Sequence, residues 1–172
     1  MKKCSLPPFL AVALLSFVFV TLTDAAAPAK SGSAPAVGDP VEFKFSDSHG
    51  KMVDTSKLKG KVILVDFWAT WCGPCKAEIP HVIEAYNKLH AKGFEIVGIS
   101  LDSDKATLNK FTKDNKMPWS QYFDGGGWKN KLAVKYGIHG IPAMWLIDKE
   151  GKVASTGARG NLEAEVEKLL AK

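Results

Sequence analysis

The feature that most limits the fold of this chain is an abrupt change of hydrophobic period near Cys72. Residues 62–68 are almost continuously apolar, with β-branched and aromatic side chains, which is typical of a strand buried on both faces. From Cys72 to about Ala91 the apolar residues recur at helical spacing instead, and Gly93 ends the pattern. A second apolar run at 94–101 predicts a parallel neighbouring strand, reached by a right-handed crossover.

The segments on either side of this unit predict a mixed sheet. Ahead of it, two short runs at 41–45 and 51–53 enclose turn residues, which predicts a hairpin that adds an edge to the sheet. Behind it we expect a helix that starts at Asp102 or Ser103, and a last helix that starts at Asn161. The elements expected after the second strand are a helix to 115, a strand at 120–123, a helix at 128–136, strands at 144–147 and 152–156, and a helix after 161. This order predicts an α/β fold, a mixed central sheet flanked by helices.

The first residues of the chain predict export. Lys2 and Lys3 precede an apolar run at 6–22 that is followed by alanines, which is the layout of a secretory signal peptide. The run is 17 residues long, near the lower limit for a bilayer-spanning helix, so an uncleaved anchor is the alternative. We interpret residues 1–29 as signal peptide or membrane anchor, 30–40 as a flexible linker, and 41–172 as one folded domain. Whether the leader is cleaved or anchors the chain, we expect this domain in the periplasm or otherwise outside the cytoplasm.

The distribution of charge argues against nucleic acid as a partner. The net charge of +5 comes from lysines dispersed along the chain, and Arg159 is the only arginine. A nucleic-acid surface would instead cluster Lys and Arg with stacking aromatic residues. We therefore expect no nucleic-acid binding.

Cys72 and Cys75 are the residues expected to carry chemistry. A thiol at the first turn of a helix faces unpaired N–H groups and the positive end of the helix dipole, which lower its pKa from about 8.5 toward 7. Cys72 is therefore the predicted nucleophile, and Cys75, three residues later, the resolving thiol. We expect no cofactor other than a redox-active disulfide between them. The remaining cysteine, Cys4, lies in the leader.

Two other uses of a Cys-x-x-Cys pair fit this sequence less well. A structural disulfide across two residues closes too small a loop to restrain much unfolded chain. Half of a zinc site has the same spacing, but a second half is missing. The four histidines are dispersed, at His49, His81, His90 and His139. No metal is expected.

The segment 66–76, Asp-Phe-Trp-Ala-Thr-Trp-Cys-Gly-Pro-Cys-Lys, resembles the active-site segment of thioredoxins. The similarity includes Pro80, where thioredoxins kink the active-site helix, and 136–142, which resembles the segment leading to the cis-proline of that family. It extends from about Val62 to the C-terminus. The resemblance implies a thioredoxin fold, with the N-terminal hairpin and a central helix–strand insert as additions.

The resemblance also implies a substrate groove beside the cysteine pair. Pro142 would follow Ile141 through a cis bond and leave the Ile141 backbone free to pair with an extended substrate, whereas a trans proline at a strand start is the alternative. Gly157 and Ala158 resemble the last backbone contact of that groove, and Trp71 is expected at its rim, with Trp68 in the core. The predicted substrate-binding set is Trp71, Gly73, Pro74, Ile141, Pro142 and Gly157.

Two carboxylates are further candidates for catalysis. Asp66 lies within an apolar strand, so burial should raise its pKa and let it exchange protons with Cys75; a partly hydrated carboxylate is the alternative. Thioredoxins pair this aspartate with a lysine on the adjacent strand, and residues 94–101 contain none. Glu78 lies where TlpA/ResA-type thioredoxins often have an acidic residue, and an exposed helix carboxylate is its alternative interpretation.

The length of the insert at 102–123, the hairpin and the leader resemble the TlpA/ResA-type thioredoxins, which act at the outer face of bacterial membranes. This resemblance implies protein thiols and disulfides as partners, a membrane electron donor, and clients such as apocytochrome c during cytochrome c biogenesis or copper-site assembly proteins. We expect a monomer.

The predicted function is thiol:disulfide exchange, with the Gly-Pro spacer favouring a reductase, because thioredoxin has a potential of about −270 mV. One alternative is a peroxiredoxin-like thiol peroxidase, but Ala69 and Val65 stand where peroxiredoxins have Thr or Ser and proline. Another is a non-catalytic module that binds peptide, or copper through the cysteine pair with a further ligand.

Overall fold

The computed structural model describes Met1 and residues 32–172 of this chain. The predicted signal peptide or anchor, Met1 apart, and the first part of the predicted linker lie outside these residues. The division into leader, linker and domain therefore stays a prediction. Within the described part of the chain, no helix is both long enough and apolar enough to cross a membrane.

A five-stranded mixed sheet forms the centre of the molecule, in the order β5-β4-β3-β6-β7. Its strands are β3 (Val62–Trp68), β4 (Phe94–Ser100), β5 (Gln121–Tyr122), β6 (Ala143–Ile147) and β7 (Val153–Ser155). β3 is parallel to β4 and antiparallel to β6, and every residue of β3 is buried. A strand that is covered on both faces cannot alternate polar and apolar residues, which explains its continuous apolar run.

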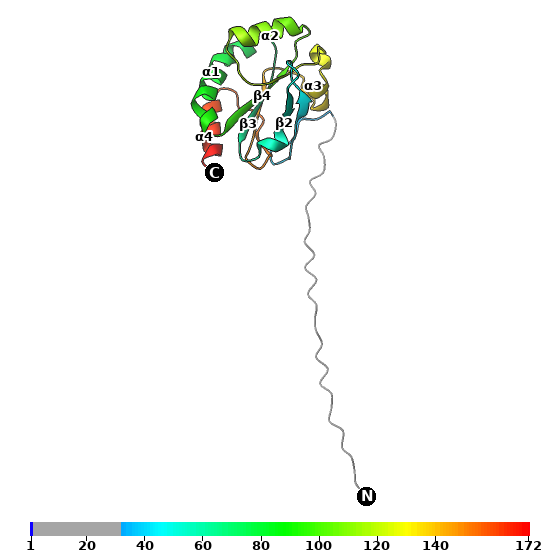
Figure 1. Ribbon diagram of the computed structural model, residues 1–172, viewed down its shortest axis with the longest axis vertical. Coiled ribbons are helices and arrows are strands. Elements are labelled where there is room, and N and C mark those ends of the chain that lie inside the picture. Colours follow the sequence, from blue (N-terminus) through cyan, green and yellow to red (C-terminus); the bar gives the residue numbers. More distant parts are fainter. Residues whose placement is uncertain (2–31) are drawn as a thin grey trace.

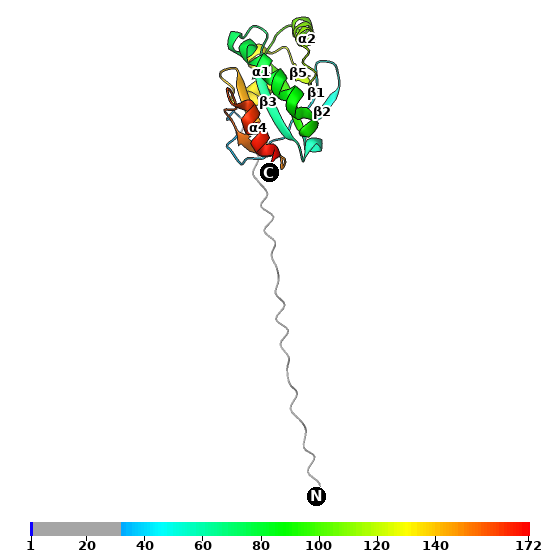
Figure 2. The same cartoon turned by 90° about the vertical axis from the view of Figure 1, so that its left-hand side faces the viewer.

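Helices cover both faces of this sheet, as the sequence predicts. They are α1 (Gly73–Leu89), α2 (Lys105–Asp114), α3 (Lys131–Lys135) and α4 (Leu162–Leu170), with 3₁₀ helices η1 (Thr55–Leu58), η2 (His90–Lys92) and η3 (Gly127–Lys129). α1 and α4 lie side by side on one face, and α3 lies on the opposite side of the sheet (Figures 1 and 2). Gly93, in the left-handed region at φ 105°, ends η2 directly after α1 and turns the chain into β4.

The N-terminal hairpin forms, but the prediction that it adds an edge to the main sheet is wrong. β1 (Lys44–Ser46) and β2 (Met52–Asp54) pair only with each other. The reason is that the hairpin contacts the domain through aromatic side chains: Phe43 packs on Tyr136 and Phe45 on Tyr122, with ring centroids 5.3 and 5.1 Å apart. It therefore covers apolar surface instead of continuing the backbone ladder.

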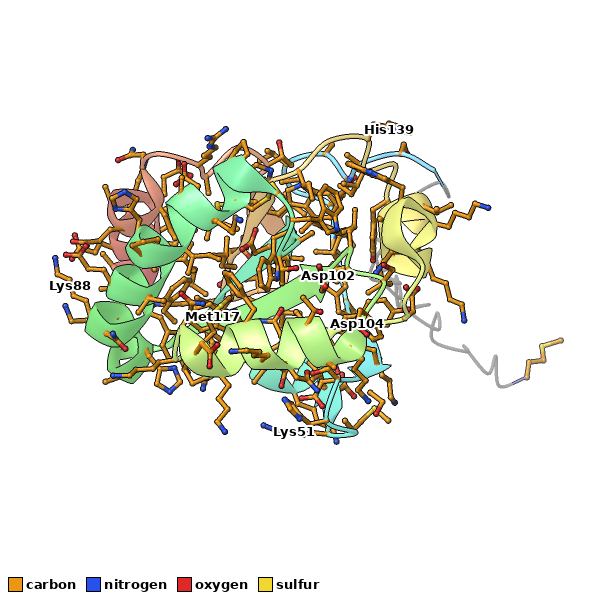
Figure 3. The ribbon with its side chains drawn as sticks, turned by 90° about the horizontal axis from the view of Figure 1, so that it is seen from above. Lys51, Lys88, Asp102, Asp104, Met117 and His139 are labelled. Atoms are coloured by element: carbon orange, nitrogen blue, oxygen red, sulfur yellow. A yellow bond between two sulfur atoms is a disulfide. The ribbon has the colours of Figure 1, made fainter. Side chains whose placement is uncertain are left out.

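Two helix boundaries also differ from the prediction. α2 is capped by Asp104, whose Oδ1 accepts a hydrogen bond from the Thr107 N–H at 2.7 Å, and not by Asp102 or Ser103. Figure 3 shows Asp102 and Asp104 together near the start of α2. The helix expected at 128–136 is divided into η3 and α3, because the Asn130 side chain caps a new helix there.

Two segments near the start of the domain bond to the outer edges of the sheet: residues 38–41 at β7, and the hairpin turn at β5. At β7, the Gly38 N–H donates to the Val153 carbonyl at 2.8 Å, and the Val153 N–H donates to Asp39 at 2.9 Å. At β5, the Ser48 N–H in the hairpin turn donates to the Gln121 carbonyl at 2.8 Å. The described part of the predicted linker thus lies against the domain.

Candidate active site

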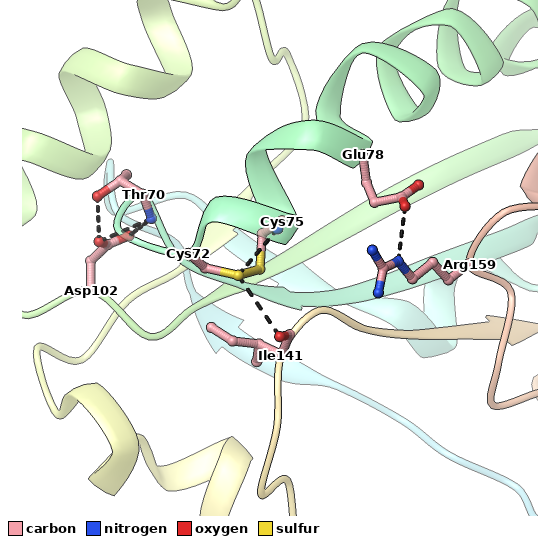
Figure 4. Close-up of a disulfide and its surroundings, with 7 residues drawn as sticks. All are labelled: Thr70, Cys72, Cys75, Glu78, Asp102, Ile141 and Arg159. Atoms are coloured by element: carbon pink, nitrogen blue, oxygen red, sulfur yellow. Dashed lines mark hydrogen bonds and ion pairs between the residues drawn. A yellow bond between two sulfur atoms is a disulfide. The ribbon is translucent and has the colours of Figure 1, made fainter.

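The cysteine pair lies where β3 gives way to α1. Cys72 is the N-cap residue of α1, and it forms a disulfide with Cys75, with the two sulfur atoms 2.03 Å apart (Figure 4). Both residues are buried. The fold thus joins the two predicted redox residues in a disulfide at the start of a helix.

The surroundings of Cys72 favour negative charge on its sulfur. Cys72 Sγ accepts a hydrogen bond from the Cys75 backbone N–H at 3.2 Å, and it lies at the positive end of the dipole of the 17-residue helix α1. Both interactions are stronger with a thiolate than with a thiol, so in the reduced protein they favour the anion. The local structure is thus consistent with the nucleophilic role predicted for Cys72, which stays a prediction.

The loop before β6 brings a carbonyl group to the same sulfur. The Ile141 carbonyl oxygen lies 3.8 Å from Cys72 Sγ, although 69 positions separate the two residues. A disulfide sulfur carries no hydrogen, so only the reduced Cys72 thiol could donate to this oxygen. The Ile141–Pro142 peptide bond is cis, as the thioredoxin resemblance implies.

Gly157 lies in the loop after β7, next to that same region. The following residue, Ala158, donates its backbone N–H to the Met144 carbonyl in β6 at 3.3 Å. Trp71, Gly73 and Pro74 are exposed around the pair. The structure thus gathers the predicted substrate-binding residues at one end of the sheet, while their role in binding stays a prediction.

Asp66 is a buried acid in the central strand β3. It lies within β3, only 3% exposed, and its Oδ1 has no hydrogen-bond partner among the described residues. Loss of hydration, with a further contribution from the charge of Glu78, raises the pKa of Asp66 from 3.8 to about 7. Its neighbour across the parallel ladder is Gly98, so the lysine that thioredoxins place on this strand is absent here. Because Asp66 is buried from water, the alternative interpretation of it as a partly hydrated carboxylate is wrong.

Glu78 is neither free nor fully exposed. Its Oε1 accepts a hydrogen bond from Arg159 Nε at 2.8 Å, and the Glu78 side chain is 17% exposed (Figure 4). Arg159 lies in the loop that also contains Gly157, so this ion pair ties the active-site helix to the far side of the predicted groove. No pattern in the sequence indicates this partner, although Arg159 stands out as the only arginine of the chain.

The turn between β3 and α1 is held by a second carboxylate. Asp102, which is buried, accepts hydrogen bonds from the Thr70 hydroxyl at 2.6 Å, the Thr70 backbone N–H at 3.2 Å and the Ser100 hydroxyl at 2.7 Å. These bonds fasten the residues just before Cys72 to the end of β4. Because its oxygen atoms are used in this way, Asp102 does not cap α2.

The two tryptophans of the motif have the environments expected for them. Trp68 is 1% exposed and donates its Nε1–H to Gln121 Oε1 at 3.0 Å. Trp71 is 51% exposed, and its ring centroid lies 6.0 Å from that of Trp128, a residue that the sequence analysis did not single out. Among the described residues, no group of three or more His, Cys, Asp or Glu side chains could hold a metal ion.

Comparisons with known proteins agree with this site. A model of the AhpC/TSA family matches residues 37–156. The thiol-disulfide oxidoreductase ResA of Bacillus thuringiensis subsp. konkukian (strain 97-27) is 32% identical over 130 residues, which are 76% of this chain and 73% of that protein.

Two solved structures have the same fold at similar identity. The thioredoxin domain of a thiol-disulfide oxidoreductase from Bacteroides vulgatus has a TM-score of 0.71 at 32% identity, covering 80% of this chain and 99% of that one. A DsbE-type thiol:disulfide interchange protein from Chlorobium tepidum has a TM-score of 0.63 at 31% identity, covering 84% and 99%.

Proposed function

The chain belongs to the AhpC/TSA family and is a thiol-disulfide oxidoreductase of thioredoxin fold, and we propose that it reduces disulfide bonds of proteins outside the cytoplasm. The observation that carries the proposal is the Cys72–Cys75 disulfide at the first turn of α1, beside the Ile141 carbonyl. Protein thiols and disulfides are its substrates, and its own disulfide is the only redox group that the reaction needs.

The first step is attack on the client. In the reduced protein the Cys72 thiolate attacks one sulfur atom of the client disulfide, forming a mixed disulfide and releasing the other client sulfur as a thiolate, which takes up a proton from water. The hydrogen bond from the Cys75 N–H and the dipole of α1 stabilise the attacking anion. The backbone beside Ile141 pairs with the extended client and holds its disulfide near Cys72.

The second step releases the client. Asp66, as a carboxylate, takes the proton of Cys75, directly or through one water molecule. The Cys75 thiolate then attacks Cys72 Sγ, which forms the Cys72–Cys75 disulfide and expels the second client sulfur. The client gains two electrons and the protein loses two. Two electrons from a membrane dithiol donor then restore the Cys72–Cys75 pair.

The leader and the relatives support the extracytoplasmic location. The basic and then apolar N-terminal sequence has the layout of an export signal or anchor. ResA and a DsbE-type protein are among the relatives. We propose that clients are apoproteins awaiting haem or copper, whose cysteines must be reduced before they bind, and that the protein works as a monomer.

The decisive experiment measures reduction of insulin disulfides with dithiothreitol as the electron source. We expect activity in the wild type and its loss in Cys72→Ser, because the nucleophile is gone. Cys75→Ala should accumulate a mixed disulfide with the client through Cys72, visible by mass spectrometry. Full activity in Cys72→Ser would refute the proposal, and turnover of hydrogen peroxide without insulin reduction would favour the peroxidase alternative.

A further inference from the structure

Two large aromatic side chains are exposed together beside the reactive disulfide. Trp71, the residue directly before Cys72, is 51% exposed, and Trp128 in η3 is 49% exposed. Their ring centroids lie 6.0 Å apart with the planes inclined by 54°. Exposure of two neighbouring tryptophans keeps apolar surface in water, and such patches mark interaction sites more often than chance. We call Trp71 and Trp128 the tryptophan pair.

The segment that carries Trp128 is held in place by buried hydrogen bonds. Asn130, which is fully buried, donates from Nδ2 to the Ser100 carbonyl at 3.0 Å and accepts at Oδ1 from the N–H groups of Leu132 and Ala133. On the other side of Trp128, Asp124 Oδ1 accepts from the Gly126 N–H at 2.9 Å. The exposed indole therefore projects from a fixed turn.

The same strand end also holds Trp71. Ser100 donates its hydroxyl to Asp102, and Asp102 accepts from Thr70, the neighbour of Trp71. The two segments that carry the indoles, although far apart in the sequence, are thus both bonded to the carboxyl end of β4. A binding surface that is fixed before its partner arrives loses little conformational entropy on binding.

Within the part of the chain that the structure describes, two lysines beside the pair take part in no ion pair. Lys129 and Lys131, which follow Trp128, are exposed. None of the ion pairs found among the described residues includes either of them. The nearest carboxylate in the segment, Asp124, is engaged by the N–H groups of Gly126 and Lys131 and by the Tyr122 hydroxyl. The surface thus combines aromatic rings with free cationic side chains.

We propose that the tryptophan pair with Lys129 and Lys131 is a specificity site for the client, which binds a polypeptide segment with an aromatic side chain and an acidic residue next to its disulfide. Aromatic rings pack favourably on indoles, and carboxylates complement free ammonium groups. A protein client is favoured over a membrane surface because Trp71 adjoins the reacting Cys72. The inference rests on the proposed reductase function and adds the class of client segment.

The test compares two disulfide-bridged peptides that differ only in having Trp or Ala beside one cysteine. We measure kcat/KM for each with the reduced protein, relative to oxidised glutathione as a small reference disulfide. The wild type should prefer the Trp peptide about five- to tenfold, which corresponds to one aromatic contact. In Trp128→Ala this preference should fall to about twofold or less, and Trp128→Phe should keep most of it.

Met52→Ala provides the matched control, because Met52 is a large apolar residue that is 62% exposed on β2, away from the cysteine pair. It should keep the wild-type preference. Since Trp128 is exposed, its replacement should leave the far-ultraviolet circular dichroism unchanged, which separates a lost contact from a lost fold.

The charge of the site is tested with peptides that carry Asp or Lys next to the aromatic residue. The wild type should favour the Asp peptide at low ionic strength, and the preference should shrink in 0.5 M salt because exposed charges are screened. Lys129→Glu with Lys131→Glu should reverse it. Lys92→Glu, beyond the opposite end of α1 from Cys72, is the control and should leave the preference for the Asp peptide unchanged.

The outcomes distinguish a failure of the proposed reductase function from a failure of the specificity site. If the wild type reduces neither peptide nor insulin, the reductase function fails. If it reduces both peptides but Trp128→Ala keeps the full preference, only the specificity site is refuted. Loss of binding to anionic phospholipid vesicles in Trp128→Ala, with an unchanged peptide preference, would refute it in favour of a membrane contact.

Discussion

Asp66 is the residue whose chemistry depends most on its place in the fold. In an apolar strand, away from water and from any basic partner, it holds its proton to about pH 7 instead of releasing it near 3.8. A group that ionises near neutral pH can both accept and return a proton under physiological conditions. A pKa in this range suits Asp66 to the resolving step that we propose.

The release of client from the mixed disulfide should therefore depend on the ionisation of Asp66. In the wild type we expect the rate to rise as pH passes through about 7, because only the carboxylate accepts the Cys75 proton. Asp66→Asn should lower the rate near neutral pH by about 100-fold and move the rise to the higher pH at which Cys75 ionises unaided. Stopped-flow measurement of client release checks this, and an unchanged profile would contradict it.

The same raised pKa predicts how stability changes with pH. The folded chain keeps the Asp66 proton between about pH 4 and 7 while the unfolded chain loses it, so this group's stabilisation is complete below pH 4 and lost as pH rises through 7. From pH 5 to 8 the wild type should lose about 3 kcal/mol more than Asp66→Asn. Urea unfolding of the disulfide-bonded proteins measures the difference, and equal losses would count against the assignment.

Arg159 should influence the pKa of Asp66 through Glu78. The negative charge of Glu78 contributes to the raised pKa of Asp66, and the guanidinium of Arg159 partly offsets that charge. We expect Arg159→Met to move the midpoint of the pH–rate profile upward and Glu78→Gln to move it downward. The double variant should resemble Glu78→Gln, since Arg159 acts through Glu78. A midpoint that Arg159→Met leaves unmoved would show that the pair is only structural.

At the scale of elements, the sequence predicts best where one cause determines the local pattern. β3 coincides with its predicted range because burial on both faces demands a continuous apolar run. The disulfide that pairs Cys72 with Cys75 at the start of α1 could be predicted because both cysteines lie within one short sequence motif. The catalytic role of Asp66 stays a prediction.

The parts that could not be predicted depend on contacts between distant residues. Asp102 is a good capping residue by type, but its partners Thr70 and Ser100 are known only once β3 and β4 lie side by side. The hairpin has a strand pattern, yet whether it extends the sheet depends on where Phe43 and Phe45 find apolar surface. Trp128 and Arg159 lie next to Trp71 and Glu78 only because the fold brings these distant residues together.

The pairing of β4 with β5 depends on the missing side chain at Gly98. A Cβ added there would lie 2.0 Å from Gln121 Oε1, the atom that accepts the Trp68 indole hydrogen bond. Gly98→Ala should therefore lower the free energy of unfolding by about 1–3 kcal/mol through overpacking, as urea unfolding can show. Gly140→Ala, where an added Cβ meets nothing within 4 Å, should change it by less, and equal effects would contradict this explanation.

At the scale of the whole molecule, residues 38–41 protect one edge of the sheet and the hairpin turn protects the other. The outer edge of β7 is bonded to residues 38–41, and that of β5 to the hairpin turn. Unpaired strand edges promote association between chains. We expect a chain lacking residues 1–41 to form oligomers as its concentration rises, and one lacking residues 1–31 to stay monomeric. Light scattering after gel filtration distinguishes them, and two monomeric variants would show that these contacts are dispensable.

The backbone hydrogen bond between Asp39 and Val153 joins a segment near the start of the domain to one near its end. The first of these segments is therefore synthesised well before the second. Contacts so distant along the chain carry a loop-closure cost that slows folding. A chain that emerges from a ribosome or crosses a membrane from its N-terminus must therefore carry residues 38–41 without their partner until β7 arrives. Helpers that shield nascent chains would be needed most during that interval.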